Sequence, residues 1–279
     1  MRGSSRYQNR RGEARLAFST SLCLALLSAC APASSPTSVT SLSSLSSPAA
    51  SITALAVNPS GALVCIAGGR VFKLENLKTW SALPSPTSAS SAAWIDGNWW
   101  LALPGAGLIY KATGVPQSVS VSGSPALLTS RFAFTTSGEV LDYSGSSIGR
   151  VGALPSATLE TTGTTFALVG RVVYAISQRV ERRQTLDGTV NSLVSRNDEL
   201  EVLPGLAARA SGFTYRLEGR ELTARDSTDR VTARVAFPST TTTIIASSDW
   251  VTVATGSSVS VYRSPTLSPI LSSSCGGGL

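Results

Sequence analysis

Residues 166–176 read FALVGRVVYAI, two apolar segments on either side of Gly170. Valine, isoleucine, tyrosine and phenylalanine favour β-strands, because their side chains pack well on a pleated surface. Glycine adopts the positive φ that a tight turn between antiparallel strands requires. The stretch therefore predicts a β-hairpin in which residues 166–169 pair with residues 172–176.

The same hairpin pattern recurs five more times, each time with glycine at the turn. The paired segments are residues 63–67 with 71–74, 99–103 with 108–110, 132–134 with 140–143, 213–217 with 222–224, and 250–254 with 259–262. A small-residue or apolar segment precedes each hairpin. Another follows it and often ends in an apolar residue and proline, as at Leu83-Pro84 and Phe237-Pro238. Proline suits an outermost strand, because an edge can spare the missing N–H.

Four strands that return roughly every 35 residues are typical of a β-propeller. The repeats predict an all-β protein with six four-stranded blades, at about 52–87, 88–122, 123–155, 156–204, 205–238 and 239–272. The fourth repeat is longer, and its excess contains Asp187-Gly188, a strong hairpin signal. We expect an extra hairpin that projects from that blade; a seventh, degenerate blade is the alternative.

The first 29 residues have the composition of an export signal. Residues 1–15 carry five arginines and one glutamate, and residues 16–27 carry no charge. The segment Leu27-Ser28-Ala29-Cys30 then resembles the lipobox of bacterial membrane lipoproteins. The resemblance implies a signal peptide over residues 1–29, diacylglyceryl transfer to the Cys30 thiol, cleavage after Ala29 and acylation of the new amino group. More than one acyl chain gives stable membrane anchoring.

Residues 31–51 consist almost entirely of serine, alanine, proline, threonine and leucine, without any charge. This composition predicts a flexible linker over residues 30–51. We expect the propeller over residues 52–272 and a flexible tail over residues 273–279. The lipobox resemblance implies an exported protein, anchored to a bacterial cell membrane and facing the periplasm or the exterior, with the choice of membrane open.

The charge and the absence of histidine exclude several function classes. The formal net charge is +7, but the leader contributes five arginines and one glutamate, so the remaining chain carries 18 basic and 15 acidic residues, a net +3. This balance lacks the strongly basic patch that nucleic-acid binding needs. The chain has no histidine, the commonest general base and metal ligand. We therefore expect no nucleic-acid partner, no cofactor and no metal, and an enzyme is less favoured.

Cys65 and Cys275 are the only cysteines left once the leader is removed and Cys30 is lipidated. Cys65 lies in the first repeat and Cys275 just after the last. Because a closed ring brings the first and last blades together, a disulfide between them would lock the closure, and export to an oxidising compartment permits it. Alternatively both thiols are free, with Cys275 in a mobile tail.

Trp94, Trp99 and Trp100 form the most aromatic stretch of the chain, around Asp96-Gly97-Asn98. They are a candidate binding patch, on which a sugar or an apolar side chain of a partner would stack. Successive strand residues face opposite sides, so Trp99 and Trp100 do not both lie on one surface. Packing between blades is the alternative for these tryptophans.

Charged residues gather between residues 178 and 234, where ten arginines meet nine acids. The pair Arg182-Arg183 is suited to a phosphate or an acidic partner, since each guanidinium offers a rigid fork of donors. The near balance of charge instead favours solvated outer strands with cross-strand ion pairs.

No catalytic residue is assignable from the sequence. Four isolated acids are candidates to line a channel: Asp96, Asp142, Glu160 and Asp249. Nothing in their spacing selects a pair, and the Asp-box of sialidase-type propellers, calcium loops and phosphate loops are missing. The sequence favours a lipid-anchored cell-envelope binding or scaffold protein that recognises protein or glycan through propeller loops. The alternative is a carboxylate-dependent hydrolase of envelope polysaccharide, which needs two acids at one mouth of the channel.

Overall fold

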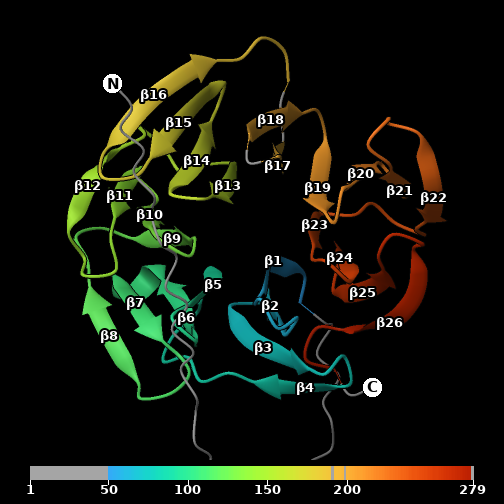
Figure 1. The fold of residues 1–279 in the computed structure, drawn as a ribbon. Coiled ribbons are helices and arrows are strands. Elements are labelled where there is room, and N and C mark those ends of the chain that lie inside the picture. The colour runs from blue at the N-terminus through green and yellow to red at the C-terminus, as the bar shows by residue number, and fades with distance from the viewer. Residues whose placement is uncertain (1–49, 190–191, 198, 278–279) are drawn as a thin grey trace, which may run out of the picture. The chain divides into compact units, whose positions relative to one another are not determined.

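The computed structural model describes residues 50–189, 192–197 and 199–277. This part of the chain forms strands throughout, with one 3₁₀ turn, η1 (Pro104–Ala106), and no α-helix. Six four-stranded antiparallel sheets, each built from consecutive strands, form the blades of a β-propeller (Figure 1). The all-β propeller with six four-stranded blades, predicted from the repeats, is thus confirmed.

The strands of the first three blades occupy residues 52–150. They are β1 (Ile52–Val57), β2 (Leu63–Ala67), β3 (Arg70–Glu75) and β4 (Thr79–Ala82); β5 (Ser91–Ile95), β6 (Asn98–Leu103), β7 (Leu108–Lys111) and β8 (Gln117–Ser120); β9 (Pro125–Leu128), β10 (Ala133–Thr135), β11 (Glu139–Leu141) and β12 (Ser147–Arg150). In each blade the strands follow one another in chain order, and the first strand is innermost, where it contacts the first strands of neighbouring blades (Figure 1).

The other three blades and a smaller sheet occupy residues 157–274. The blades contain β13 (Ala157–Thr161), β14 (Thr164–Val169), β15 (Val172–Ile176) and β16 (Val180–Thr185); β19 (Leu206–Ala210), β20 (Phe213–Glu218), β21 (Glu221–Arg225) and β22 (Val231–Ala236); β23 (Thr243–Ala246), β24 (Trp250–Thr255), β25 (Ser258–Arg263) and β26 (Ser268–Ser274). The smaller sheet contains only β17 (Ser192–Arg196) and β18 (Glu199–Leu203).

The predicted hairpins are the second and third strands of the blades. In the hairpin around Gly170, β14 pairs with β15 from Val169↔Val172 to Thr165↔Ile176. These middle strands are almost continuously apolar because both of their faces are covered by neighbouring blades. In β2, for example, every residue from Leu63 to Ala67 is buried.

The two-stranded sheet corrects the expectation for the long fourth repeat. Residues 156–204 form two sheets, and Asp187-Gly188 lies in the connection between β16 and β17 rather than in a hairpin turn. The hairpin of the small sheet turns instead at Asn197, whose φ is 53°. Leu203-Pro204, another apolar residue followed by proline, lies at the end of the second strand of this sheet and not at the end of an outermost strand.

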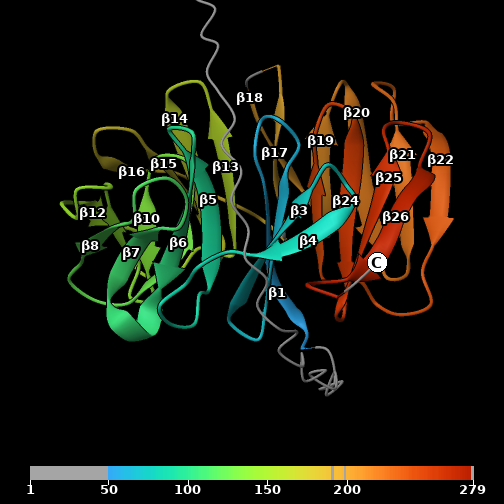
Figure 2. The ribbon, with the colours of Figure 1, turned by 90° about the horizontal axis from the view of Figure 1, so that it is seen from below.

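The small sheet has its own position in the ring rather than projecting from it. Its strand β17 contacts β13 on one side and β19 on the other, as the first strands of neighbouring blades do elsewhere. Figures 1 and 2 show it between β13–β16 and β19–β22. The six full blades are therefore accompanied by one incomplete blade, which is the alternative that the sequence left open.

Among the described residues, ring closure does not involve exchange of a strand between the first blade and the last. The first blade begins with β1 and the last ends with β26, and each consists of its own consecutive strands. Between these blades, the backbone N–H of Ile52 donates to Gly256 O at 2.8 Å, and Trp80 Nε1 donates to Ser273 Oγ at 2.9 Å. The boundary expected at residue 272 falls inside β26, whose residues Ser273 and Ser274 still pair with β25.

Candidate functional site

A central cavity of about 840 Å³ lies among the innermost strands of the ring. All seven sheets contribute to its wall, including β17 of the incomplete blade through Leu193, Val194 and Ser195. The lining residues come from the middle of some of these strands, such as β13, and from the ends of others with the turns that follow, such as Ser130 after β9 and Ser248 after β23. Most of the lining side chains are aliphatic or hydroxylated.

Two ionisable side chains line this cavity among the described residues, Glu160 and Arg209. Glu160 Oε2 accepts a hydrogen bond from the backbone N–H of Ser130 at 3.0 Å, which ties β13 to the turn after β9. Arg209 Nη1 donates to Glu201 Oε2 at 2.8 Å, and only 13% of the Arg209 side chain is exposed. The cavity therefore has one carboxylate and one guanidinium that is already paired.

Tyr143 contacts the cavity wall at Thr129, and its pKa is affected by the charge of Glu160. The Tyr143 hydroxyl donates to Thr129 O at 2.5 Å. Burial raises the pKa of Tyr143 well above 10.0, and the negative charge of Glu160 raises it further. A protonated phenol that holds the turn after β9 is therefore the favoured state.

The structure places Trp94 and Trp99 together at one junction between blades and Trp100 at another, so the three tryptophans do not form one binding surface. Trp99 and Trp100 are 0% and 8% exposed and pack against different neighbouring blades, so they offer no binding surface. The physical reason is the alternation of side chains along β6, which turns each ring into one junction between blades. Only Trp94, which is partly exposed, lines the central cavity. Its ring packs edge-on against Trp99, with centroids 5.2 Å apart.

The four candidate acids do not converge. Glu160 alone is among the residues that line the cavity. Asp96 lies in the turn between β5 and β6, and Asp249 between β23 and β24. Asp142 lies in the turn between β11 and β12, where its Oδ1 accepts hydrogen bonds from Ser144 and Ser146. The acid pair that a glycosidase requires is thus not present in the described lining.

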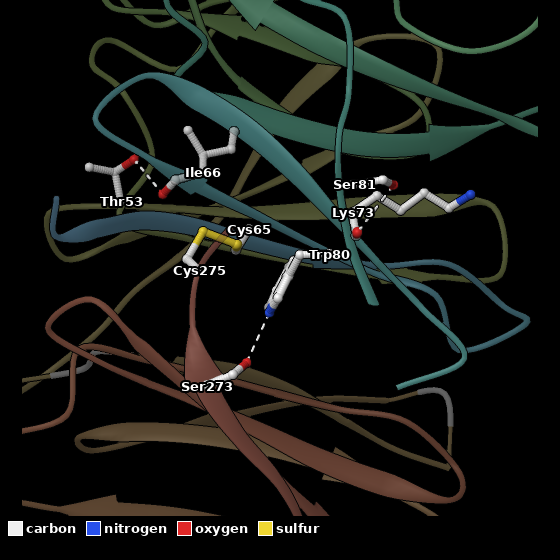
Figure 3. The surroundings of a disulfide bond; sticks show 8 residues. All are labelled: Thr53, Cys65, Ile66, Lys73, Trp80, Ser81, Ser273 and Cys275. Carbon is white, nitrogen blue, oxygen red and sulfur yellow. Dashed lines mark hydrogen bonds between the residues drawn. A yellow bond between two sulfur atoms is a disulfide. The ribbon is translucent and has the colours of Figure 1, made fainter. Parts of the chain in front are cut away.

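Cys65 and Cys275 are joined by a disulfide (Figure 3). Cys65 is fully buried in β2, and Cys275 follows β26, where its backbone N–H donates to Ser257 O at 3.0 Å. The bond connects the first blade to the last, close to the hydrogen bond from Trp80 to Ser273. The described part of the tail is therefore attached to the propeller at Cys275, through the disulfide and this backbone hydrogen bond.

Within the described ranges, no group of three or more aspartate, glutamate, cysteine or histidine side chains is arranged to hold a metal ion. The described residues also form no helix that is long and apolar enough to cross a membrane. Cys30, the predicted lipidation site, lies outside the described residues, as do the signal peptide and nearly all of the linker.

Sequence reasoning missed most of the cavity wall. Thr129, Ser130, Leu159 and Arg209 carried no motif that distinguished them. Their shared property is a position within a first strand or in the turn after it, which the repeat pattern would have indicated had the first strands been aligned with one another.

The fold is similar to those of several solved propellers, while no family model and no curated protein matches the chain. PorZ, a surface component of the type-IX secretion system of Porphyromonas gingivalis, gives a TM-score of 0.55 at 12% identity. The match covers 80% of this chain and 38% of PorZ, so the chain spans well under half of that protein.

Two further solved structures match at comparable levels. Sqt1 of Saccharomyces cerevisiae gives a TM-score of 0.54 at 12% identity, covering 80% of this chain and 85% of Sqt1. Virginiamycin B lyase of Staphylococcus aureus gives a TM-score of 0.50 at 10% identity, and the match covers 75% of this chain and 79% of the lyase. At such low identities, these similarities establish the propeller fold alone.

Proposed function

We propose that the protein is a lipid-anchored binding module of the bacterial cell envelope, and that the mouth of its central cavity receives an apolar side chain of a partner protein. The observation that carries the proposal is the position of Trp94. It is the partly exposed aromatic side chain of an open, mainly aliphatic cavity. Such a concave apolar surface with a few polar groups is typical of a binding site.

The composition of the wall favours a protein segment over a glycan. Aliphatic residues such as Val57, Leu128, Leu159 and Ile244 form much of the lining, and they stabilise a bound apolar group by removing its surface from water. Glycan recognition uses several side chains that hydrogen-bond to sugar hydroxyls, whereas polar side chains of this wall already have partners within the protein. Arg209 pairs with Glu201, Glu160 accepts from the Ser130 N–H, and the Thr129 hydroxyl donates to Phe132 O. Trp94 is the one feature that favours a glycan, because a sugar ring would stack on it.

The anchor is supported by the lipobox resemblance at Leu27 to Cys30. The Ser-rich segment after it would hold the propeller some 25 Å from the membrane if it behaves as a random coil. PorZ, whose fold is similar over part of its length, is a bacterial surface component, and this supports an envelope location only by analogy. Partners are therefore sought among envelope proteins first and envelope glycans second.

Site-specific photo-crosslinking in intact cells tests the binding site. A photoreactive amino acid at Ser130, on the cavity wall, should yield an adduct with one discrete partner. The same amino acid at Val115, which is 81% exposed, is the matched control. The adduct should be lost in a Trp94→Ala protein that keeps its melting temperature. Equal adducts at the two positions, or an adduct that survives the substitution, would refute the cavity as the binding site.

Mass spectrometry of the mature N-terminus tests the anchor separately. We expect a protein that begins at Cys30 and carries acyl groups, and a Cys30→Ala variant that leaves the membrane fraction. An unmodified Cys30, or cleavage elsewhere, would refute the anchor and leave the cavity proposal standing.

A further inference from the structure

The junction between the incomplete blade and blade β19–β22 is chemically unlike the other junctions of the ring. Clusters of buried apolar side chains fill the six other junctions between neighbouring sheets in the described structure. No such cluster joins β17–β18 to β19–β22. Arginines line this junction instead, which indicates that it is not built as an ordinary blade-to-blade contact.

Cross-strand pairing places four arginines and two threonines on one face of blade β19–β22, which we name the arginine face: Arg209, Arg216, Arg225, Arg234, Thr214 and Thr223. The opposite face carries Tyr215, Leu217, Leu222 and Ala224, which pack in the cluster shared with β23–β26. The ion pair of Arg209 with Glu201 on β18 shows that the arginine face is turned toward the incomplete blade.

The same register places Glu218 and Glu221 on this face, and Glu221 pairs with Arg234 at 3.3 Å. The acids among the described residues nevertheless leave part of the face unpaired. Asp229 is shared by Arg216 and Arg225, at 3.5 and 3.4 Å. The Nε atoms of both arginines are buried and have no hydrogen-bond partner. A buried donor without an acceptor is unfavourable, so an added carboxylate would be stabilised here.

The incomplete blade leaves an open strand edge opposite this face. In every full blade the second strand pairs on both sides, but β18 pairs only with β17. Among the described residues, no other backbone–backbone hydrogen bond reaches residues 199–203. The sheet lacks the third and fourth strands of a full blade, although Leu186 of the connection between β16 and β17 packs in the cluster beside β18. Figure 1 shows β18 set between the longer blades β13–β16 and β19–β22. Such an edge can accept an added strand.

The opposite wall of this opening is apolar. Leu200 and Val202 of β18 pack in a cluster with Val173 of β15 and Leu193 of β17. A strand added beside β18 would point its side chains alternately toward this apolar wall and toward the arginine face. Strand alternation therefore specifies its sequence pattern, with apolar and acidic residues at alternate positions.

We propose that an extended segment of a partner protein, with alternating acidic and apolar residues, pairs with the edge of β18 and completes this blade. Its carboxylates lie against Arg216 and Arg225, and its apolar side chains extend the cluster around Val173. A cavity of about 310 Å³ opens at one end of the junction, beside Arg196 and Ser227, and provides room for one end of the segment.

Two other occupants fit less well. The chain's own linker contains no aspartate or glutamate between residues 31 and 51, so it lacks the charge that complements the arginine face. A second copy would offer its own β18, but that strand is equally recessed, by two strand positions or about 10 Å. The β18 edges of two copies could not reach each other, because the neighbouring blades would collide first. A single extended peptide is narrow enough to reach the edge of β18.

Peptide binding to the full-length protein in detergent tests the proposal. The probe is a fluorescent seven-residue peptide of alternating glutamate and valine. The controls are a lysine–valine peptide and a glutamate–valine peptide with methylated backbone nitrogens. We expect anisotropy to report binding of the probe only, weakening at high salt because exposed charges are screened. Equal binding of either control peptide would refute strand pairing against the arginine face.

Matched variants locate the site. The double variant Arg216→Gln/Arg225→Gln should weaken probe binding about tenfold or more, because charge-assisted hydrogen bonds are lost. Arg182→Gln/Arg183→Gln, on the exposed strand β16, should leave binding unchanged. Asp229→Asn removes the competing acid and should tighten binding, a gain that misfolding does not produce. No gain in that variant, or concentration-dependent dimers that block the probe, would overturn the proposal.

Discussion

Cys65 and Cys275 are 210 residues apart in the sequence, yet their Cα atoms lie 6.2 Å apart and a disulfide joins them. The bond lies between the first and last blades, which share no strand within the described part of the chain. Ring closure therefore depends on side-chain packing, a few hydrogen bonds and this one covalent link. A tie across so many residues restricts the unfolded chain strongly.

Reducing the disulfide should destabilise the propeller substantially. The chain-entropy model gives about 5 kcal/mol for a loop of this length, as an upper estimate. We expect the urea midpoint of the oxidised protein to fall on reduction to that of a Cys275→Ser variant, which is itself insensitive to reductant. Identical midpoints with and without reductant in the wild-type protein would contradict this expectation.

Glu160→Gln should lower the pKa of Tyr143. Burial is the main cause of the raised pKa, and the Glu160 charge adds to it, so removal of the charge leaves a smaller shift. Because the folded-state pKa is raised, the associated stability is present below pH 10.0 and is lost as the pH rises through the folded pKa. Phenolate absorbance in an alkaline titration measures the shift, and Tyr143→Phe identifies the transition. A Tyr143 titration unchanged in the Glu160 variant would show that the two groups do not interact.

The ionised Asp142 carboxylate should stabilise the folded protein at pH values above its pKa. Burial raises its pKa, but hydrogen bonds from Ser144 and Ser146 outweigh burial and leave the pKa below 3.8. A depressed folded-state pKa means that the stability is present above the unfolded pKa and is lost as the pH falls through the folded one.

Asp142→Asn should therefore flatten the acid-side decline of the urea midpoint. The pKa of Asp226 is lowered too, chiefly by the hydroxyl of Thr228, so Asp226→Asn provides an independent case in another blade. The two effects should add, because the sites are distant. A steep acid decline that persists in the double variant would assign it to other groups.

Gly138→Ala should destabilise the protein more than Gly170→Ala. Both glycines have positive φ, 77° and 59°, so each alanine carries backbone strain of about 1 kcal/mol. A Cβ at residue 138 would also lie 2.7 Å from Gly152 C, whereas one at residue 170 meets nothing within 4 Å. The clash should add about 1–3 kcal/mol, measured by urea unfolding. Equal losses would indicate that the turn after β10 shifts without strain.

The fold was predictable because it is encoded locally and repeatedly. Each hairpin carries its own apolar segments and its own turn glycine, as at Val169, Gly170 and Val172, so no long-range information is needed to find it. The incomplete blade was harder, because Asp187-Gly188 signals a turn equally well inside a hairpin and between two sheets.

The site was less predictable because it depends on which face of a strand meets a cavity. Trp94, Trp99 and Trp100 are equivalent in composition, yet only Trp94 lines the cavity. The arginine face could not be predicted from the sequence for the same reason. Its members are spread over four strands, and only their register brings Arg216 and Arg225 onto one surface opposite β18.

By itself the sequence determined the all-β class, the six hairpin repeats and the residues able to close the ring, because periodicity and turn chemistry act within a few residues. The tertiary structure alone decided that β17–β18 occupies a ring position, that Glu160 is the one acid among the described residues that line the central cavity, and that four arginines lie on the blade face opposite β18. Those properties arise from the register and order of the sheets, which bring together residues that no local pattern relates.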